Sequence, residues 1–389
     1  MNICIISPRY PYKDNMEFVF VKKLVDEWAR MGHRCVVITE FPLVTYLRKR
    51  IEYKPLHYAD EVAPGVAVEV YNPRTLNVPW MFRDVEVGRW LASRSIELQI
   101  RRIGIQFDFI YCHFFVSAFL AYRYAHKHNV PLFVATGESD IPALHKPSRD
   151  FSVEAFRNYT SGVIAVSSKN KDEAAKLGLI EPSKCKVFPN GTDLSVFHPK
   201  DRRECRERLG LPQDKFIISC VGFICERKGQ NRLLEAVRKL NDENVNLLFL
   251  GKEAILESFA LEGEEILFKG AVENKEIPTF LCASDVFCLP TRAEGCCNAV
   301  IEALACGLPV ISSNLPFNWD VLDESNSIMV DPDNVEEIAE AITRIKENML
   351  LRKSLSDGAL EKSQRLDVHQ RANGILDFIM KRSKNKKYE

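Results

Sequence analysis

The sequence predicts an α/β protein built from two doubly wound domains, each a parallel β-sheet with helices on both faces. Three observations carry this prediction. The chain has 389 residues, more than one hydrophobic core usually serves. Short apolar runs alternate with amphipathic helical segments in both halves, which is the order typical of parallel sheets. An extended segment with an Asn-Gly turn, residues 186–199, separates the two halves.

The first half contains alternating strands and helices from its first residues onward. The strand expected at 2–7 is followed by a helix at 17–32 that ends at Gly32, and by a second strand at 35–39. Further strands are expected at 66–74, 107–115, 131–140 and 162–168, and helices at 90–104, 119–129, 151–160 and 169–178. We therefore expect a doubly wound parallel sheet over roughly the first 180 residues.

Residues 41–60 are less regular and allow two interpretations. Arg48, Lys49, Arg50 and Lys54 alternate with apolar and aromatic residues. Such a basic amphipathic segment can rest on anionic lipid or bind an acidic acceptor. Alternatively, it is a solvated helix face over a small apolar stripe.

The second half repeats the alternation after a charged helix at 201–210. Strands are expected at 216–223, 246–251, 265–270, 285–290, 309–314 and 327–332, and helices at 231–241, 253–261, 274–283, 295–306 and 333–348. A last helix, expected at 350–382, ends in the basic sequence KRSKNKK. This tail is either a solubilising terminus or an anchor.

The composition narrows the functional classes. Lys+Arg and Asp+Glu both number 53, so no excess of positive charge indicates a nucleic-acid partner. The 12 cysteines lie mostly inside apolar runs without CxxC spacing, which indicates buried free thiols in a reducing compartment. No apolar run approaches the ~18 residues that a membrane span needs, and the start lacks the basic region of a signal peptide. We expect a cytoplasmic protein that can contact the inner face of the membrane.

The stretch 289–314 organises the second half. It is expected to form a strand, a loop, a helix, a tight turn and another strand, with Glu294 and Glu302 eight positions apart. At 3.6 residues per turn, two such positions share one helix face, about 12 Å apart along the axis. A helix N-terminus between them would offer backbone N–H groups to an anion.

These residues resemble glycosyltransferase family 4, a group of nucleotide-sugar-dependent transferases with the GT-B fold. The resemblance covers essentially the whole chain and is densest from 186 to 345, where residues 188–199 look like the family's connecting segment. The remaining positions that carry it are Glu294, Gly295, Asn298, Glu302, Ala303, Gly307, Pro309 and Val310.

The family's architecture implies two Rossmann-like domains that face each other across a cleft. Residues 1–190 would bind the acceptor, and residues 191–366 would bind the nucleotide sugar. Residues 367–389 would form a helix and basic tail that pack back on the N-terminal domain.

The resemblance also implies roles for individual residues on the donor side. Glu294 would contact hydroxyls of the donor sugar, and Glu302 would accept hydrogen bonds from the ribose hydroxyls. Lys228 would neutralise the leaving diphosphate. Gly222 ends the strand that precedes Lys228, and Gly270 belongs to the loop beside the base.

The loop at the start of the helix at 295–306 would hold the distal phosphate of the donor. Gly295 would belong to the donor-binding residues of this loop, and the backbone N–H groups of Cys296, Cys297 and Asn298 would bind the phosphate.

The sequence departs from the family at several positions. Phe223 stands where the family has an arginine, and Arg227 could partly replace that arginine from the same loop. Thr136–Asp140 lacks the family's histidine before a glycine, and Asn15–Glu17 replaces a glycine-rich first loop.

Two residues of the first half match family positions, each with a second interpretation. Asp140 matches an acid that either positions the acceptor or caps the next element. His113, at the end of a strand on the edge of the expected cleft, matches a frequent family histidine, although a histidine at the end of a strand can also be structural.

Taken together, the resemblance implies a retaining glycosyltransferase that moves a hexosyl group from a nucleotide-diphosphate sugar to a glycan or lipid-linked acceptor, in surface polysaccharide or glycoconjugate biosynthesis. It implies neither a cofactor nor a metal. Two alternatives remain open: a sugar-nucleotide epimerase or hydrolase with the same fold, and a nucleotide-sugar-binding subunit with weakened catalysis.

Overall fold

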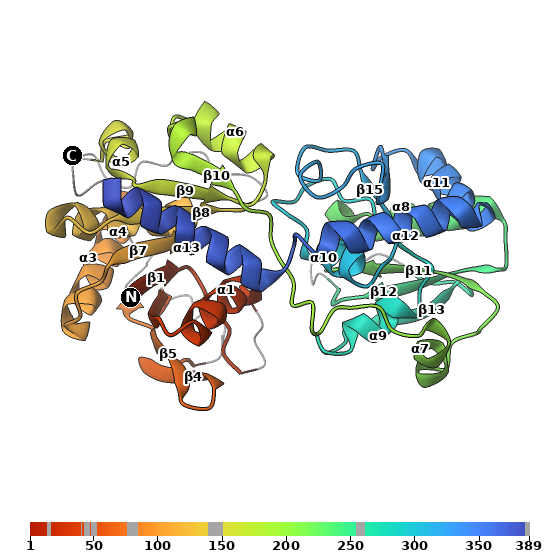
Figure 1. Cartoon of the computed structure of the whole chain (residues 1–389), viewed down its shortest axis with the longest axis horizontal. Coiled ribbons are helices and arrows are strands. Elements are labelled where there is room, and N and C mark those ends of the chain that lie inside the picture. The colour runs from red at the N-terminus through yellow and green to blue at the C-terminus, as the bar shows by residue number, and fades with distance from the viewer. Residues whose placement is uncertain are drawn as a thin grey trace. The chain divides into compact units, whose positions relative to one another are not determined.

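The chain forms two compact units (Figure 1). The computed structural model describes residues 1–13, 17–39, 41–42, 47, 53–75, 85–138, 151–253 and 261–385. Unit 1 comprises Met1–Phe188 and Ala372–Glu389, and unit 2 comprises Pro189–Arg371. The boundaries expected from the sequence, at 190 and 366, lie close to the divisions after Phe188 and after Arg371.

In the described part of unit 1, eight strands form one sheet in the order β10-β9-β8-β7-β1-β2-β5-β4. The strands are β1 (Asn2–Ser7), β2 (Arg34–Thr39), β4 (His57–Ala63), β5 (Val66–Tyr71), β7 (Phe109–His113), β8 (Leu132–Thr136), β9 (Gly162–Ala165) and β10 (Cys185–Val187). The short β3 (Phe41–Pro42) and β6 (Arg74–Thr75) pair separately. The helices are α1 (Val19–Arg30), α3 (Val85–Ile103), α4 (Phe115–His128), α5 (Val153–Tyr159), α6 (Ser168–Lys176), the 3-10 helix η1 (Pro182–Lys184) and α13 (Val368–Asn385).

The expectation of a wholly parallel first sheet was wrong at one edge. Strand β4 pairs antiparallel with β5, and only Pro64-Gly65 connects the two. A tight turn of this kind can join only antiparallel neighbours, because a parallel pair needs a long crossover. The sequence reading missed β4 altogether, since its residues alternate in exposure instead of forming an apolar run.

Helices cover both faces of the first sheet, as the alternation of β1 shows. Ile3 and Ile5 point toward the face covered by α1 and pack near Trp28, which is fully buried. Cys4 and Ile6 belong to the core on the other face, with residues of α3 and α4. Successive side chains of a strand point to opposite faces, so a strand that is apolar at every position must be covered on both.

Most of the C-terminal helix α13 belongs to unit 1, which takes up the chain again at Ala372. Ala372, Ile375 and Ile379 of α13 lie in the same core as Trp28, whose indole N–H donates to the carbonyl of Ala372 at 3.1 Å. A single helix over 350–382 was wrong, because the structure has α12 (Met349–Ser363) and α13 with a break between them.

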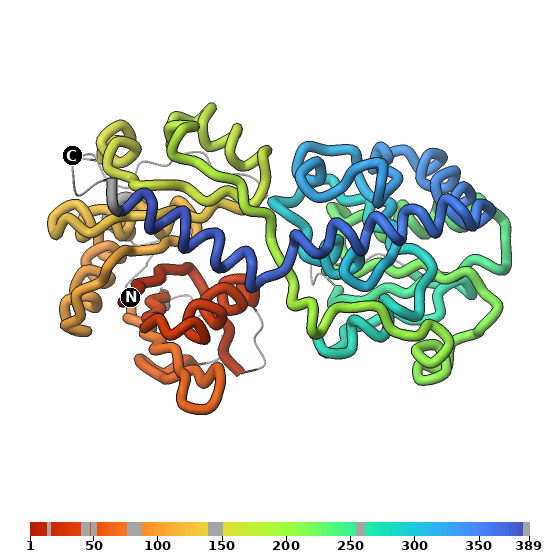
Figure 2. Tube along the Cα trace, viewed as in Figure 1, coloured from red at the N-terminus to blue at the C-terminus, as the bar shows by residue number. Residues whose placement is uncertain are grey.

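The break between α12 and α13 coincides with backbone pairing to the interdomain segment. The N–H of Thr192 donates to the carbonyl of Leu366 at 2.9 Å, and the N–H of Val368 donates to the carbonyl of Thr192 at 3.0 Å. Figure 2 shows the green and blue segments side by side here. Gly191 permits this approach, since a Cβ on it would lie 2.9 Å from the carbonyl oxygen of Leu366.

In the described part of unit 2, six parallel strands form the sheet β13-β12-β11-β14-β15-β16. The strands are β11 (Phe216–Val221), β12 (Val245–Leu250), β13 (Ile266–Gly270), β14 (Val286–Leu289), β15 (Val310–Ser313) and β16 (Ser327–Val330). The helices are α7 (Arg202–Leu209), the 3-10 helix η2 (Glu226–Lys228), α8 (Gln230–Leu240), α9 (Ile277–Cys282), α10 (Asn298–Ala305), α11 (Val335–Glu347) and α12. The predicted strands are therefore confirmed, whereas the helix expected at 253–261 lies almost wholly outside the described residues.

Two further expectations concern the membrane. In the segment 41–60, the side chains of Leu47, Tyr53 and Leu56 are exposed, but Arg48, Lys49 and Arg50 lie outside the described residues. Contact of this segment with a membrane or an acceptor stays a prediction. No helix in the described part of the chain combines the length and apolar character required to cross a bilayer.

Candidate functional site

The candidate site lies where the strand order of the second sheet reverses. Strands β12 and β13 lie on one side of β11, and β14, β15 and β16 follow on the other. In open α/β sheets, ligands bind outside the carboxyl ends of the strands at such a switch point. The connections that follow β11 and β14 therefore form this site.

The connection after β11 depends on two glycines. Gly222 has φ +145°, and a Cβ on it would lie 3.5 Å from Nζ of Lys228. Gly229 ends η2 with φ +79°, and a Cβ there would lie 2.4 Å from the carbonyl oxygen of Pro290. A side chain at Gly229 would collide with backbone, so this glycine lets η2 pack against the end of β14.

The connection after β14 brings Glu294 against η2. Oε1 of Glu294 lies 2.7 Å from Nζ of Lys228 and 2.6 Å from Nη1 of Arg227. The hydroxyl of Thr291 donates to the same oxygen at 3.2 Å. The side chains of Lys228 and Glu294 are only 11% and 14% exposed, whereas that of Arg227 is 43% exposed.

Both buried charges are stabilised by their partners. Burial pushes the pKa of Glu294 upward, but Lys228 and Arg227 outweigh it and hold that pKa below its usual value. Burial pulls the pKa of Lys228 down, while Cys297 and Glu294 raise it, and the net effect is a raised pKa. Lys228 is therefore an ammonium and Glu294 a carboxylate at neutral pH.

A buried arginine that the sequence reading missed supports this arrangement. Arg232, in the first turn of α8, donates from Nη2 to the carbonyl of Pro290 at 2.9 Å and from Nη1 to the carbonyl of Glu226 at 3.1 Å. Its Nε donates to the carbonyl of Pro332 at 2.7 Å. One guanidinium thus ties together the ends of β14 and β16 and the start of η2. An arginine in a helix next to leucines gives no signal of this role in the sequence.

The expectation that Glu294 and Glu302 share one helix face was wrong. Helix α10 begins at Asn298, so Glu294 and Gly295 lie in the preceding loop. The ion pairs of Glu294 hold that loop against η2, and Cys297 is the N-cap residue of α10. Glu302 does lie on α10 and is buried, with 7% exposure.

Asn190 of the interdomain segment fastens the start of α10. Its side-chain amide donates to Oδ1 of Asn298 at 2.9 Å and to the carbonyl of Cys296 at 3.2 Å. In the sequence, Asn190 has the signal of a turn residue only, although its side chain directly orients the loop that is expected to bind phosphate. Cys296 and Cys297 are buried, and burial raises the pKa of the Cys296 thiol to about 12.

Gly270 lies at the same edge of the sheet but farther from Lys228. It ends β13, and its carbonyl accepts a hydrogen bond from the N–H of Gly251 at 2.8 Å. Strand β12 separates it from β11 and Gly222. Gly270 therefore lies at the carboxyl end of the outermost strand, apart from the charged residues of η2.

In unit 1, His113 ends β7 at the switch point of the first sheet, next to β1. It is buried among the rings of Phe20, Tyr111 and Phe114, whose centroids lie 5.1–6.1 Å from its own. Asp140, the other residue predicted in this unit, lies outside the described residues.

Glu138 is a buried carboxylate at this edge that the sequence reading did not single out. It accepts hydrogen bonds from the hydroxyl of Thr136 at 2.7 Å and from the N–H of Gly137 at 2.8 Å. A weaker bond comes from the N–H of Phe115 at 3.4 Å, in the first turn of α4. Burial is the main influence on the Glu138 carboxyl and raises its pKa, although these hydrogen bonds oppose the rise. Glu138 therefore joins the end of β8 to the start of α4.

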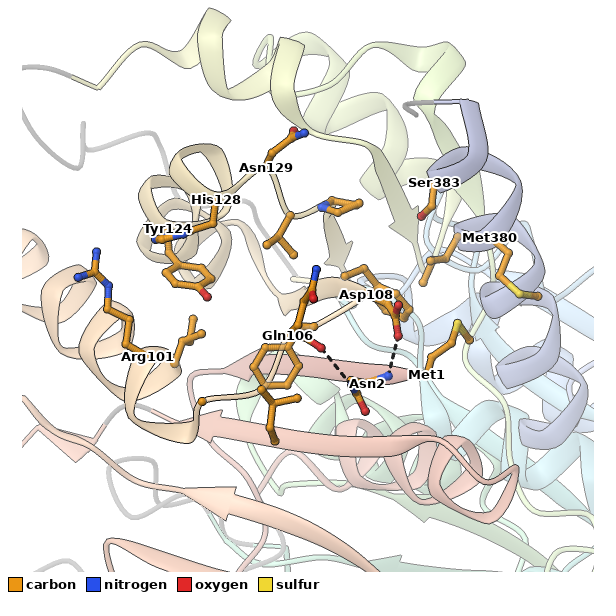
Figure 3. Close-up of a pocket in the computed structure, with 18 residues that line it drawn as sticks. Met1, Asn2, Arg101, Gln106, Asp108, Tyr124, His128, Asn129, Met380 and Ser383 are labelled. Atoms are coloured by element: carbon orange, nitrogen blue, oxygen red, sulfur yellow. Dashed lines mark hydrogen bonds between the residues drawn. The ribbon is translucent and has the colours of Figure 1, made fainter. Parts of the chain in front are cut away.

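A cavity of about 930 Å³ lies elsewhere, at the opposite edge of the first sheet (Figure 3). Residues that directly precede strands line it, namely Met1, Asp108 and Pro131, together with the C-terminal ends of α3, α4 and α13. None of the predicted site residues within the described part of the chain lines this cavity. This cavity is therefore separate from the candidate site, which is defined by the charged residues at the carboxyl edge of the second sheet and not by cavity volume.

Two family models match the chain. The model described as Glycosyltransferase Family 4 matches residues 18–196, and the model described as Glycosyl transferases group 1 matches residues 201–362. The two matches follow one another along the chain and together span most of both units.

Individual proteins are similar over comparable lengths. TuaC of Bacillus subtilis (strain 168), a glycosyltransferase whose name assigns it to teichuronic acid biosynthesis, is 29% identical over 375 residues, which cover 94% of each chain. The UDP-Gal:alpha-D-GlcNAc-diphosphoundecaprenol alpha-1,3-galactosyltransferase of Escherichia coli is 24% identical over 301 residues, 72% of this chain and 76% of that one. The structure of Anabaena HepE in complex with UDP-glucose has a TM-score of 0.70 at 18% identity and covers 98% of this chain and 100% of HepE.

The packing of Gly229 generates a prediction about stability. Gly229→Ala should reduce the free energy of unfolding by about 3 kcal/mol, because the new methyl group adds a collision with Pro290 to the cost of a positive φ. Gly210→Ala is the matched control, since Gly210 has φ +66° and no atom within 4 Å of an added Cβ. It should cost only about 1 kcal/mol. Urea unfolding followed by circular dichroism measures both, and equal losses would contradict the proposed collision.

Proposed function

The chain belongs to glycosyltransferase family 4 and has the GT-B fold, and from this premise we propose that it transfers a hexosyl group from a nucleotide-diphosphate sugar to a glycan or lipid-linked acceptor. The observation that carries the proposal is Lys228, a buried ammonium held by Glu294 at the switch point of the second sheet. A cation fixed there would stabilise the negative charge that develops on a departing diphosphate.

The donor is proposed to be a UDP-sugar used in polysaccharide biosynthesis. HepE, with the same fold, is described in complex with UDP-glucose, and the Escherichia coli relative is named for UDP-Gal. The names of that relative and of TuaC refer to a diphosphoundecaprenol-linked acceptor and to teichuronic acid biosynthesis. These names support a surface polysaccharide or its lipid-linked intermediate as the product.

We assign the donor contacts within unit 2 as follows. Glu294 would accept hydrogen bonds from sugar hydroxyls through the carboxylate oxygen that does not bind the cations. Glu302, buried on α10, would accept from the ribose hydroxyls. Gly222 leaves room for Lys228 beside the diphosphate, and Gly270 would lie beside the base.

The distal phosphate would bind at the start of α10. The first turn of a helix has backbone N–H groups without intrahelical partners, and the helix dipole favours an anion there. Gly295, Cys296, Cys297 and Asn298 form this loop, which Asn190 holds in place.

The acceptor is proposed to bind unit 1. His113 and Asp140 are the candidates for contact with the transferred sugar or the acceptor, His113 because it ends a strand at the switch point of the first sheet.

His113→Ala would then raise the KM for the acceptor more than the KM for the donor. A purely structural His113 would instead lower stability without this difference.

Retention of the anomeric configuration is proposed from the charge state of Glu294. Two cations engage this carboxylate and its pKa is lowered, so it is a poor nucleophile for the anomeric carbon. Substitution on the same face through an oxocarbenium-like state needs no enzyme nucleophile. The coupling constant of the anomeric proton in the product, measured by NMR, should show the configuration of the donor, and an inverted product would contradict this mechanism.

Donor binding is expected to need no metal, because Lys228 and Arg227 already supply cations. The Asp-x-Asp spacing at Asp331 and Asp333 does not change this expectation, since Asp333 pairs with Arg292 at 2.7 Å. UDP-, GDP- and ADP-glucose can be compared by thermal shift in the presence of EDTA. We expect UDP-glucose to raise the melting temperature of the protein under these conditions. Stabilisation that requires added magnesium would contradict the metal-free assignment, and no stabilisation by any donor would contradict the proposed function.

Lys228→Ala tests the catalytic assignment. The release of UDP in the presence of acceptor should fall about 100- to 1,000-fold, because one preorganised cation is lost from the transition state. Circular dichroism should be unchanged, since Glu294 keeps its contact with Arg227. Arg208→Ala, which removes an ion pair with Glu276 between α7 and the start of α9, serves as the control. Near-normal turnover of Lys228→Ala would refute the assignment, and donor breakdown that needs no acceptor would indicate a hydrolase or epimerase.

A further inference from the structure

Two aromatic side chains of unit 2 are exposed to solvent. Among the aromatic residues in the described part of this unit, only Phe223 and Trp319 are exposed, at 61% and 57%. A single exposed apolar side chain is common and needs no explanation, whereas apolar side chains gathered in one place mark a binding surface. The location of the two rings therefore decides between these interpretations.

Both rings lie at the carboxyl edge of the second sheet. Phe223 follows β11, and Trp319 belongs to the connection that follows β15. Strand β14 lies between β11 and β15 in the sheet, so the ends of these two strands are about 10 Å apart at the usual strand spacing. The two rings are therefore on either side of the end of β14, where the connection that carries Glu294 begins.

The ring of Trp319 is held near the end of β15. Its indole N–H donates to Oδ1 of Asn314, the residue that directly follows β15, at 3.0 Å. The preceding residue, Asn318, is buried, and its side-chain amide donates to the carbonyl of Ser313 at 2.8 Å. Because the one polar group of the indole already has a partner, Trp319 offers solvent an apolar ring.

The backbone of Phe223 is fixed on both sides. The N–H groups of Gly222 and Ile224 each donate at 2.9 Å to a carbonyl at or just beyond the end of β12. The carbonyl of Phe223 itself accepts a hydrogen bond from the side chain of Gln230 at 3.0 Å. The sequence departs from the family at this position, so the end of β11 presents an uncharged aromatic ring where the family has an arginine.

A fixed aromatic ring can contact the part of a sugar that carboxylates and cations do not bind. A pyranose has C–H groups on its ring faces, and these groups are weakly positive. The face of an aromatic ring is negative and attracts them, and the contact also removes apolar surface from water. Rings that are in place before the sugar binds lose little conformational entropy.

We propose that Phe223 and Trp319 form a carbohydrate-binding subsite at the carboxyl edge of unit 2, where each ring stacks on the C–H face of a pyranose. The subsite deepens the proposed transferase function and rests on it for the source of the sugar, which is the donor hexose or a pyranose of the acceptor. Neither ring takes part in making or breaking a bond. The rings contribute to the binding of sugar and not of the nucleotide.

The test measures three affinities in the wild type, Phe223→Ala and Trp319→Ala. Calorimetry gives those for UDP and UDP-glucose, and saturation-transfer NMR gives that for methyl α-D-glucopyranoside, a pyranose without a nucleotide. Each variant should bind at least one of the two sugar ligands about tenfold more weakly, because one stacking contact is lost. UDP affinity should stay within twofold of the wild type.

The pattern of losses identifies the source of the sugar. Weaker binding of UDP-glucose with unchanged binding of UDP indicates the donor hexose, and weaker binding of methyl α-D-glucopyranoside indicates a separately bound pyranose. Sugar affinities within twofold of the wild type in either variant would overturn the two-ring subsite. An equal loss of UDP affinity would also overturn it, because the rings would then bind the base.

Further variants separate the aromatic rings from other effects. Trp319→Phe and Phe223→Tyr keep a ring and should retain sugar binding, whereas Phe223→Leu keeps only an apolar side chain and should not. Trp319→Phe lacks the N–H that binds Asn314, so a loss of sugar binding in this variant would contradict a role for the ring. Trp90→Ala, which removes an exposed tryptophan of α3 in unit 1, is the control and should match the wild type.

The results also separate this inference from the proposed function. Transfer from UDP-glucose by the wild type, with unchanged sugar affinities in the ring variants, would reject only the subsite. Failure of the wild type to bind UDP and UDP-glucose would reject the proposed donor site. The titration with methyl α-D-glucopyranoside needs no nucleotide and would still test the two rings.

Discussion

The pairing of the Glu294 carboxylate with Lys228 and Arg227 is the interaction on which the candidate site in the second unit depends. A buried ammonium is costly unless it is paired, and Lys228 is buried beside β11. Glu294 is equally unfavourable alone, and the pairing with Lys228 and Arg227 offsets both costs. Because the two partners come from the connections after β11 and β14, this pairing joins the two sides of the switch point. Stability and the charge of the site therefore have one origin.

The backbone around this pairing is arranged to keep it in place. Gly229 lets η2 approach the carbonyl of Pro290. Arg232 donates hydrogen bonds to that carbonyl and to the carbonyl of Glu226, at the start of η2. On the other side, Asn190 holds the start of α10. None of these residues needs to touch a substrate. Their effect is to fix the two cations in place, and under the proposed function little reorganisation would then oppose charge development during the reaction.

Structure that depends on local patterns is predictable from this sequence. The buried strands appear as apolar runs, and glycines mark several helix ends, so the strands of the second sheet were located correctly. Helix boundaries that depend on long-range contacts are not predictable in this way. Glu294 looked helical, but its ion pairs keep it in a loop ahead of α10. A continuous last helix was expected, but pairing with Thr192 interrupts it near Leu366. The edge strand β4 lacked an apolar run and was missed.

The sequence by itself determined the fold class and the family, and it predicted which residues bind the donor, because apolar periodicity and short motifs are properties of neighbouring positions. Only the tertiary structure decided that Glu294 lies against Lys228 and Arg227, more than sixty positions away in the chain. It also decided that Arg232 binds the carbonyls of Pro290 and Glu226 next to these charged residues. Likewise, only the tertiary structure decided that Glu138 joins β8 to α4. The physical reason is that a charge finds its partner through folding, and the distance between two buried side chains is not encoded in their spacing along the chain.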